Sequence, residues 1–205
     1  MPTKNTTPSA RTESLSAGEV LAGEFNYIAN SAFQANEDRS KAASFFIVSV
    51  GSLVAAMFGA QQLSKVEEIP VTLYLVLAFL FFGLTFLGGL TIAQLARLRA
   101  AWHESAQAMD QIKTYLIEKF PDLELKKAFR WRAETLPPLY KTNSISYYTA
   151  IEVALLSGCT FGTGVFFFQY GIQRISFLWP FSIGFGIFAL AAQLFLYKKL
   201  LLSAK

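Results

Sequence analysis

The chain has 205 residues, of which 53% are hydrophobic and only 16% are charged. Soluble domains contain about 45 to 50% apolar and about 25% charged residues, so this composition favours a membrane protein. The only cysteine is Cys159, which excludes a secreted domain held together by disulfides. The formal net charge of +4 is too small for a chain that binds nucleic acid through bulk charge.

The N-terminal segment is polar. Residues 1–15 lack the apolar core of a cleavable signal and are expected to be disordered. The S-x-x-E spacing of Ser16 and Glu19 matches a capping box, so residues 16–41 are predicted to form a cytoplasmic amphipathic helix. No Gly or Pro lies between Phe25 and the first span, and the helix is expected to run into the bilayer unbroken. Its buried stripe would contain Leu21, Phe25, Ile28, Ala32 and Ala35.

Four stretches of 23, 28, 21 and 23 residues contain no charged side chain. A helix needs about 20 residues to cross the hydrocarbon layer, and its backbone must bond internally because lipid offers no partner. The runs are too long and too uniformly apolar for barrel strands of about 10 residues. We therefore predict an all-α polytopic membrane protein with four transmembrane helices and cytoplasmic helical extensions. The spans are placed at 43–63, 71–95, 150–171 and 177–198.

The orientation follows from the basic residues. Sixteen of the 18 Lys and Arg residues lie on the side that holds both termini and the central segment. The positive-inside rule then predicts a multi-pass protein of the inner (plasma) membrane with both termini in the cytoplasm. In this scheme transmembrane hairpins at 42–95 and 148–198 flank a cytoplasmic helical insert at 96–147, and residues 199–205 form a cytoplasmic tail.

The insert is predicted to continue the second span. Residues 94–119 contain no Gly or Pro, and Pro121 should end this helix. A short helix is expected over 122–134, with Leu123, Leu125 and Phe129 buried, followed by an extended return at 139–146. The long helix carries a seven-residue repeat made by Leu95, Leu98, Trp102, Ser105, Met109, Ile112 and Leu116.

Basic residues gather in and after the short helix, where they are candidates for binding a phosphate-rich ligand. Arginine offers a bidentate fork to phosphate, and a tryptophan can stack on a base. The alternative is that these charges are attracted to anionic lipid of the inner leaflet. No glycine-rich phosphate loop is present. The candidates are Lys126, Lys127, Arg130, Trp131, Arg132 and Lys141.

Four residues of the third span are candidates for an ion path. Glu152 is ionisable and lies near the cytoplasmic boundary, where it attracts cations or merely snorkels into the headgroups. Gly158, Gly162 and Thr163 belong to a small-residue stripe that suits either close helix packing or a narrow aqueous path. Gly51, Ala55 and Gly59 form a similar stripe in the first span, and close helix packing is the favoured interpretation of both stripes.

Enzymatic activity finds no support in the sequence. His103 is the only histidine, and one cysteine cannot form a CxxC site, so we expect no catalytic residues, no metal and no cofactor. A secondary transporter is weakly supported, because Glu152 is the only ionisable group in a span.

The order of elements resembles a known kind of protein. An amphipathic helix enters span one through residues 24–39, EFNYIANSAFQANEDR, and is followed by a short outer turn, a long second helix, a cytoplasmic insert and a second hairpin. This layout resembles the small bacterial effectors of nucleotide-signalling antiphage defence, namely the SMODS-associated four-transmembrane effectors and the Hailong-type channel effector. The resemblance implies a homo-oligomeric pore in the lipid bilayer, controlled by a nucleotide or short oligonucleotide. The alternative is a non-conducting membrane anchor or scaffold that recruits a cytoplasmic partner.

Overall fold

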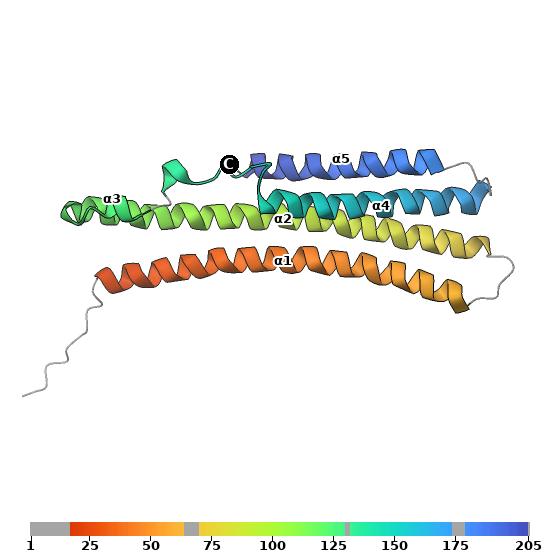
Figure 1. The fold of residues 1–205 in the computed structure, drawn as a ribbon, viewed down its shortest axis with the longest axis horizontal. Coiled ribbons are helices and arrows are strands. Elements are labelled where there is room, and N and C mark those ends of the chain that lie inside the picture. Colours follow the sequence, from red (N-terminus) through yellow and green to blue (C-terminus); the bar gives the residue numbers. More distant parts are fainter. Residues whose placement is uncertain (1–16, 64–69, 130–131, 174–178, 205) are drawn as a thin grey trace, which may run out of the picture.

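The computed structural model describes residues 17–63, 70–129, 132–173 and 179–204, and within them every regular element is a helix (Figure 1). The all-α prediction is therefore confirmed. Two short 3-10 helices, η1 and η2, lie between the longer elements. In chain order the helices are α1 (Ala17–Leu63), α2 (Val71–Lys119), η1 (Pro121–Leu123), α3 (Leu125–Ala128), η2 (Ala133–Thr135), α4 (Ile145–Gln173) and α5 (Trp179–Ser203).

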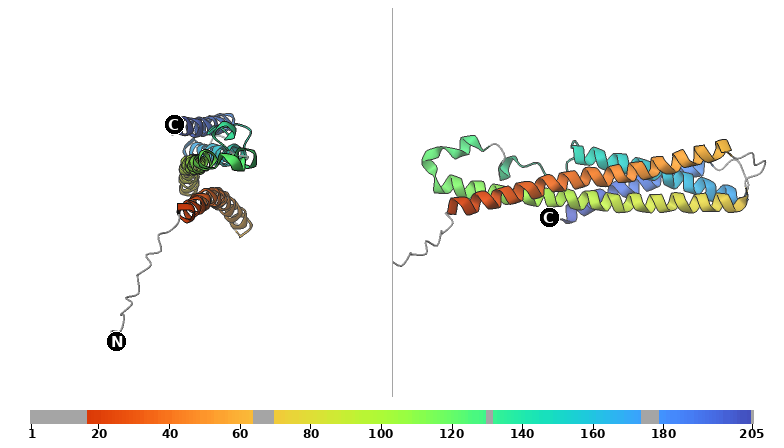
Figure 2. Two further views of the ribbon diagram at one scale, coloured as in Figure 1. Left: turned by 90° about the vertical axis from the view of Figure 1, so that its left-hand side faces the viewer. Right: turned by 90° about the horizontal axis from the view of Figure 1, so that it is seen from below.

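The four long helices lie side by side as a layered array. Seen end-on, α2 and α4 occupy the middle, while α1 and α5 lie on opposite outer sides (Figure 2). We call the end where α1 and α4 begin and α2 and α5 end the basic end, and the opposite one the hairpin end. At the basic end α1 and α2 extend well beyond α4 and α5 (Figure 1).

All four long helices have the length and apolar composition needed to cross a membrane, and on this basis the chain is a multi-pass membrane protein. α1 has 47 residues and α2 has 49, so each is about 70 Å long at about 1.5 Å per residue. A bilayer core takes up only about 30 Å of that length. Each of these two helices therefore continues without interruption from a span into a long extramembrane segment, as expected.

The core lies where α1, α2, α4 and α5 meet, and Phe46, Ile92, Val153 and Tyr197 are among its almost fully buried side chains. The predicted α1 stripe is also confirmed. Ile28, Ala32 and Ala35 are buried, while Leu21 and Phe25 are half-buried.

The predicted face of α2 does pack inward, but beyond Ala96 its most buried residues are not members of the predicted seven-residue repeat. Leu95 is buried, and the other members of the seven-residue repeat are half-buried. Beyond Ala96, the fully buried positions are Arg99, Ala106 and Asp110. Two of these three are charged, so hydropathy alone could not assign them to the interior.

The predicted single helix over 122–134 is wrong. Glu124 adopts a left-handed conformation (φ 46°, ψ 31°), which separates η1 from the four-residue α3. Phe129 is extended and lies under the Lys113 ammonium group of α2, with Nζ 5.9 Å from the ring centroid. The chain turns back toward α2 instead of continuing as a helix. Consequently Leu123 is 65% exposed, whereas Leu125 and Phe129 are half-buried.

Candidate functional site

The predicted ligand residues Lys126 and Lys127 lie on α3, at the tip of the basic end, and both are exposed. The Lys127 ammonium nitrogen is 2.7 Å from Oε2 of Glu124. An exposed ion pair of this kind contributes little to stability, but it places a carboxylate beside one of the two lysines. Lys126 therefore offers the less compensated positive charge on this helix.

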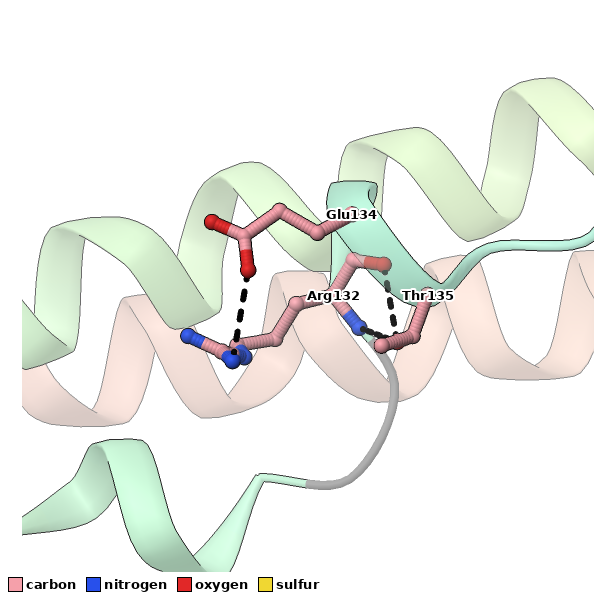
Figure 3. A network of polar contacts seen from close by, with 3 residues as sticks. All are labelled: Arg132, Glu134 and Thr135. Carbon is pink, nitrogen blue, oxygen red and sulfur yellow. Dashed lines mark hydrogen bonds and ion pairs between the residues drawn. The ribbon is translucent and has the colours of Figure 1, made fainter.

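Arg132 is held in a local polar turn, shown in Figure 3. Its guanidinium Nη2 lies 3.4 Å from Oε2 of Glu134. Its backbone N–H donates to the Thr135 hydroxyl at 3.0 Å, and that hydroxyl lies 3.1 Å from the Arg132 carbonyl oxygen, to which it donates. The guanidinium thus faces an acid from its own turn. Arg130 and Trp131 lie outside the described residues.

Lys141 lies apart from α3. It belongs to the segment that leads into α4, where its carbonyl oxygen accepts a hydrogen bond from the Ser144 hydroxyl at 2.8 Å. This segment lies near the start of α4, whereas α3 is at the far tip of the basic end (Figure 1). The structure therefore does not bring Lys141 together with Lys126, Lys127 and Arg132 as one site within a single chain.

The predicted pore glycines pack against α5. A Cβ atom on Gly158 would lie 2.7 Å from the carbonyl oxygen of Gly186, and one on Gly162 would lie 2.7 Å from that of Ser182. Real Cβ atoms essentially never come so close. Of the two interpretations of this stripe, the contacts within one chain favour helix packing.

Thr163 borders an open hollow of about 410 Å³ between α4 and α5, and its hydroxyl donates to the Cys159 carbonyl oxygen at 2.8 Å. Gly158 and Gly162 line the same hollow, together with Trp179 and Ile183. The lining is almost wholly apolar, so the hollow suits a lipid chain or another helix better than an ion.

The small-residue stripe of α1 is arranged differently from that of α4. Gly51, Ala55 and Gly59 are exposed, and nothing lies within 4 Å of a Cβ atom built on either glycine. This stripe therefore does not pack within the chain, because α1 is an outer layer and turns this face away from α2. Packing against a neighbouring molecule stays a prediction.

Glu152 is exposed on α4, in the part of the helix nearer the basic end. Within the part of the chain that the structure describes, no group of three or more His, Cys, Asp or Glu residues could hold a metal ion.

A chain of polar side chains crosses the interior between α2, α4 and α5. The Thr85 and Thr160 hydroxyls are 2.9 Å apart, and the Ser157 hydroxyl donates to the Thr85 carbonyl oxygen at 3.2 Å. Gln193 of α5 donates from Nε2 to the Ser157 hydroxyl, while its buried Oε1 finds no hydrogen-bond partner among the described residues. Neither Thr85 nor Gln193 was predicted as a polar site from the sequence, although a glutamine within an apolar run was the available signal.

We expect substitutions at the two ends of the Gln193–Ser157 bond to have unequal effects. Gln193→Leu removes one hydrogen bond and also the unpaired Oε1, so it should change stability by less than about 1 kcal/mol. Ser157→Ala leaves the Gln193 amide buried without its acceptor and should cost about 1 to 2 kcal/mol. Thermal unfolding of the purified variants in detergent checks this order, and an equal or larger loss in Gln193→Leu would contradict it.

Two arginines, one on α1 and one on α2, bond the start of α4 and the segment before it. Nη1 of Arg39 donates to the Ser146 hydroxyl at 2.6 Å, and Arg99, which is only 7% exposed, donates from Nε and Nη2 to the carbonyl oxygens of Leu139 and Pro138, both at 3.3 Å. The Tyr197 hydroxyl donates to the Ser146 carbonyl oxygen at 3.4 Å. α1, α2, α4 and α5 therefore all contribute to this set of polar contacts, which we call the polar layer of the basic end.

A second hollow, of about 510 Å³, lies beside the segment to which Arg99 is hydrogen-bonded. His103, Glu104 and Gln107 of α2 line it, together with Pro138 and Leu139. Burial, and to a lesser degree the nearby Arg99 guanidinium, lowers the pKa of His103. The imidazole is therefore neutral near pH 7. The permanent positive charges of these contacts are those of the two arginines.

The fold and these sites define a multi-pass helical membrane protein with a polar layer at its basic end. No family model matches the sequence, and no curated protein or solved structure matches it either.

Proposed function

We propose that the chain forms a homo-oligomeric membrane channel, or pore-forming effector, that a nucleotide or short oligonucleotide gates from the cytoplasm. The observation that carries this proposal is the continuity of α1 and α2, which join the spans to an extramembrane helix pair without a break. A ligand that prefers one arrangement of that pair shifts the spans by its differential affinity. Bacterial antiphage defence is the biological setting we propose for such an effector.

The pore in this proposal lies between copies of the chain. The interior of one copy is filled by large buried side chains such as Phe46, Ile92 and Tyr197, which is why the pore is placed between copies. The exposed face of α1 with Gly51, Ala55 and Gly59 supports assembly, because small residues let helices of neighbouring copies approach closely.

The ligand site in this proposal is the basic tip around α3. Lys126 and Lys127 are exposed there, and Arg132 lies in the turn that follows. Because Lys127 and Arg132 each face a carboxylate, a ligand phosphate has to compete with Glu124 and Glu134. Such competition gives the ligand-free and ligand-bound states different charge pairings at the basic tip.

Ion flux from liposomes tests the proposal. We expect purified protein to release trapped ions, and we expect the rate to change when cyclic dinucleotides or short oligoadenylates are added. The double variant Gly51→Leu, Gly59→Leu should change the flux by about tenfold or more, because bulky side chains would alter the contact between copies. The fold of each copy should be unaffected, since no atom of the same chain lies within 4 Å of either Cβ position.

Gly23→Leu is the matched control for this variant. Gly23 also lies on α1 and has nothing within 4 Å of its Cβ position, but it belongs to the extramembrane segment. The control should leave basal flux unchanged. Liposomes that stay silent with every ligand would contradict the channel proposal.

A membrane scaffold is the second candidate, and exposed aromatic residues favour it. Tyr27 and Phe33, both on the extramembrane part of α1, are each 68% exposed. Large aromatic side chains are typical of protein contact surfaces. A scaffold would leave the liposomes silent, and Tyr27→Ala and Phe33→Ala would then weaken the binding of its partner without an effect on flux.

A further inference from the structure

Arg99 is a buried cation and Arg39 a half-buried one, and neither has a counter-charge among the residues that the structure describes. No carboxylate of the described residues lies within the 4.0 Å of an ion pair from either guanidinium. Arg39 is linked to Tyr197 through Ser146, and Arg99 bonds the carbonyl oxygen of Leu139, which belongs to the same buried cluster as Tyr197. Taking a charge out of water costs several kcal/mol unless an opposite charge compensates it. A bound anion would offset this cost.

The contacts within the chain leave donors free for such an anion. A guanidinium has five N–H donors. The described contacts of Arg39 use Nη1 alone, so its Nε and Nη2 remain available, and this side chain is only half-buried. Arg99 is fixed more firmly, because Nε and Nη2 bond two carbonyl oxygens and the guanidinium carbon lies 4.4 Å from the centroid of the Trp102 ring. Arg99 is thus held in place by the chain, and Arg39 is accessible to a ligand.

The position of the pair indicates which anion it meets. Arg39 precedes the first span and Arg99 follows the second, while Ser146 lies at the start of α4 and Tyr197 near the end of α5. All four residues therefore lie at the level where hydrocarbon gives way to headgroups. Phosphate is the main anionic group at that level, and the fork of an arginine matches phosphate oxygens in a bidentate manner.

We propose that Arg39 and Arg99 form a binding site for a phosphate group at the basic end of the spans, occupied by a lipid headgroup or by a soluble phosphate-bearing molecule. The site is separate from the basic tip around α3, and it does not depend on ion conduction. Phosphate between the two guanidiniums links α1 to α2, and Ser146 connects this link to α4.

Thermal unfolding of the full-length protein tests this site in dodecyl maltoside, a detergent without phosphate. The probes are dioleoylphosphatidylglycerol, sodium phosphate and ATP, each titrated at constant ionic strength. We expect one class of probe to raise the unfolding temperature in a saturable manner, since a ligand that binds only the folded state stabilises it. A shift with the lipid alone assigns the site to a headgroup, and a shift with phosphate or ATP alone assigns it to a soluble ligand.

Arg39→Gln is the decisive variant, with Lys41→Gln as its control. Arg39 makes one described side-chain hydrogen bond, so its loss is compatible with folding, and Lys41 is an exposed cation two positions further along the same helix. Arg39→Gln should weaken the apparent affinity by about tenfold or more, as expected for the loss of a charged hydrogen bond. Lys41→Gln should bind like the wild type.

Arg99→Gln and the exposed Arg97→Gln form a second pair with the same expectation. If Arg99→Gln does not fold, the comparison of Arg39→Gln with Lys41→Gln decides alone. The proposal is overturned if no probe stabilises the wild type, or if the control variants lose as much affinity as the arginine variants, because the attraction would then be diffuse.

Discussion

Gly88→Val is expected to destabilise the protein by about 3 kcal/mol, the upper end of the usual range for an overpacked core. A Cβ atom at this position would lie 2.5 Å from the Ser157 hydroxyl oxygen, 2.7 Å from the Ser157 Cβ and 2.9 Å from the Phe46 ring. Both neighbours are fully buried, so either can shift only by disturbing the packing around it. The added side chain therefore separates α2 from α4 at the centre of the core. Thermal unfolding in detergent should show a midpoint lower by about 10 °C.

Gly89→Val provides the control for this substitution. Gly89 is the next residue of α2 and has nothing within 4 Å of its Cβ position, so the same side chain should change stability by less than about 1 kcal/mol. Equal losses in the two variants would mean that the effect comes from the helix itself and not from the contact with Ser157 and Phe46.

Gly158→Val should produce a loss of similar size at the α4–α5 contact. Its Cβ would lie 2.7 Å from the Gly186 carbonyl oxygen and 3.1 Å from the Leu190 Cβ. A carbonyl oxygen is part of the helix backbone, so it can give way only if the two helices move apart. We expect about 2 to 3 kcal/mol of destabilisation, measured as a lower unfolding temperature or a smaller yield of monodisperse protein.

The same variant separates the packing interpretation of this stripe from the pore interpretation. If Gly158 lines an ion path, valine should change flux while the unfolding temperature stays constant. If Gly158 packs helices together, valine should lower the unfolding temperature. Gly184→Val of α5 is the control, because nothing lies within 4 Å of its Cβ position.

The spans could be predicted because the energy of transfer into lipid depends on composition over about 20 residues and not on tertiary contacts. The unbroken continuation of α1 and α2 followed equally from a local property, the absence of Pro and Gly where the helices leave the membrane. The stripe containing Ile28, Ala32 and Ala35 could be predicted because helical periodicity is also local.

The candidate sites were harder to predict from the sequence because they depend on contacts between distant parts of the chain. The sequence around Arg99 is typical of a surface charge next to a span. In the fold this side chain is buried, and its guanidinium bonds a carbonyl oxygen 40 residues further along the chain. Gln193 meets Ser157 only because α5 returns beside α4. Similarly, the left-handed Glu124 ends a helical pattern for which the sequence shows no Gly or Asn as a stop signal.

The uninterrupted course of α1 and α2 also gives the membrane and extramembrane parts of each helix a common helical phase. Successive residues are rotated by about 100° around the axis, so the insertion of one alanine after Arg39 would turn the whole extramembrane stripe of α1 by that angle relative to its span. The surface of α1 that packs on α2 within the membrane and the surface that packs on α2 outside it could then no longer both face α2. By the same geometry, a twist applied to the extramembrane pair reaches the spans as a rotation of the whole helix, including the outward face that carries Gly51 and Gly59.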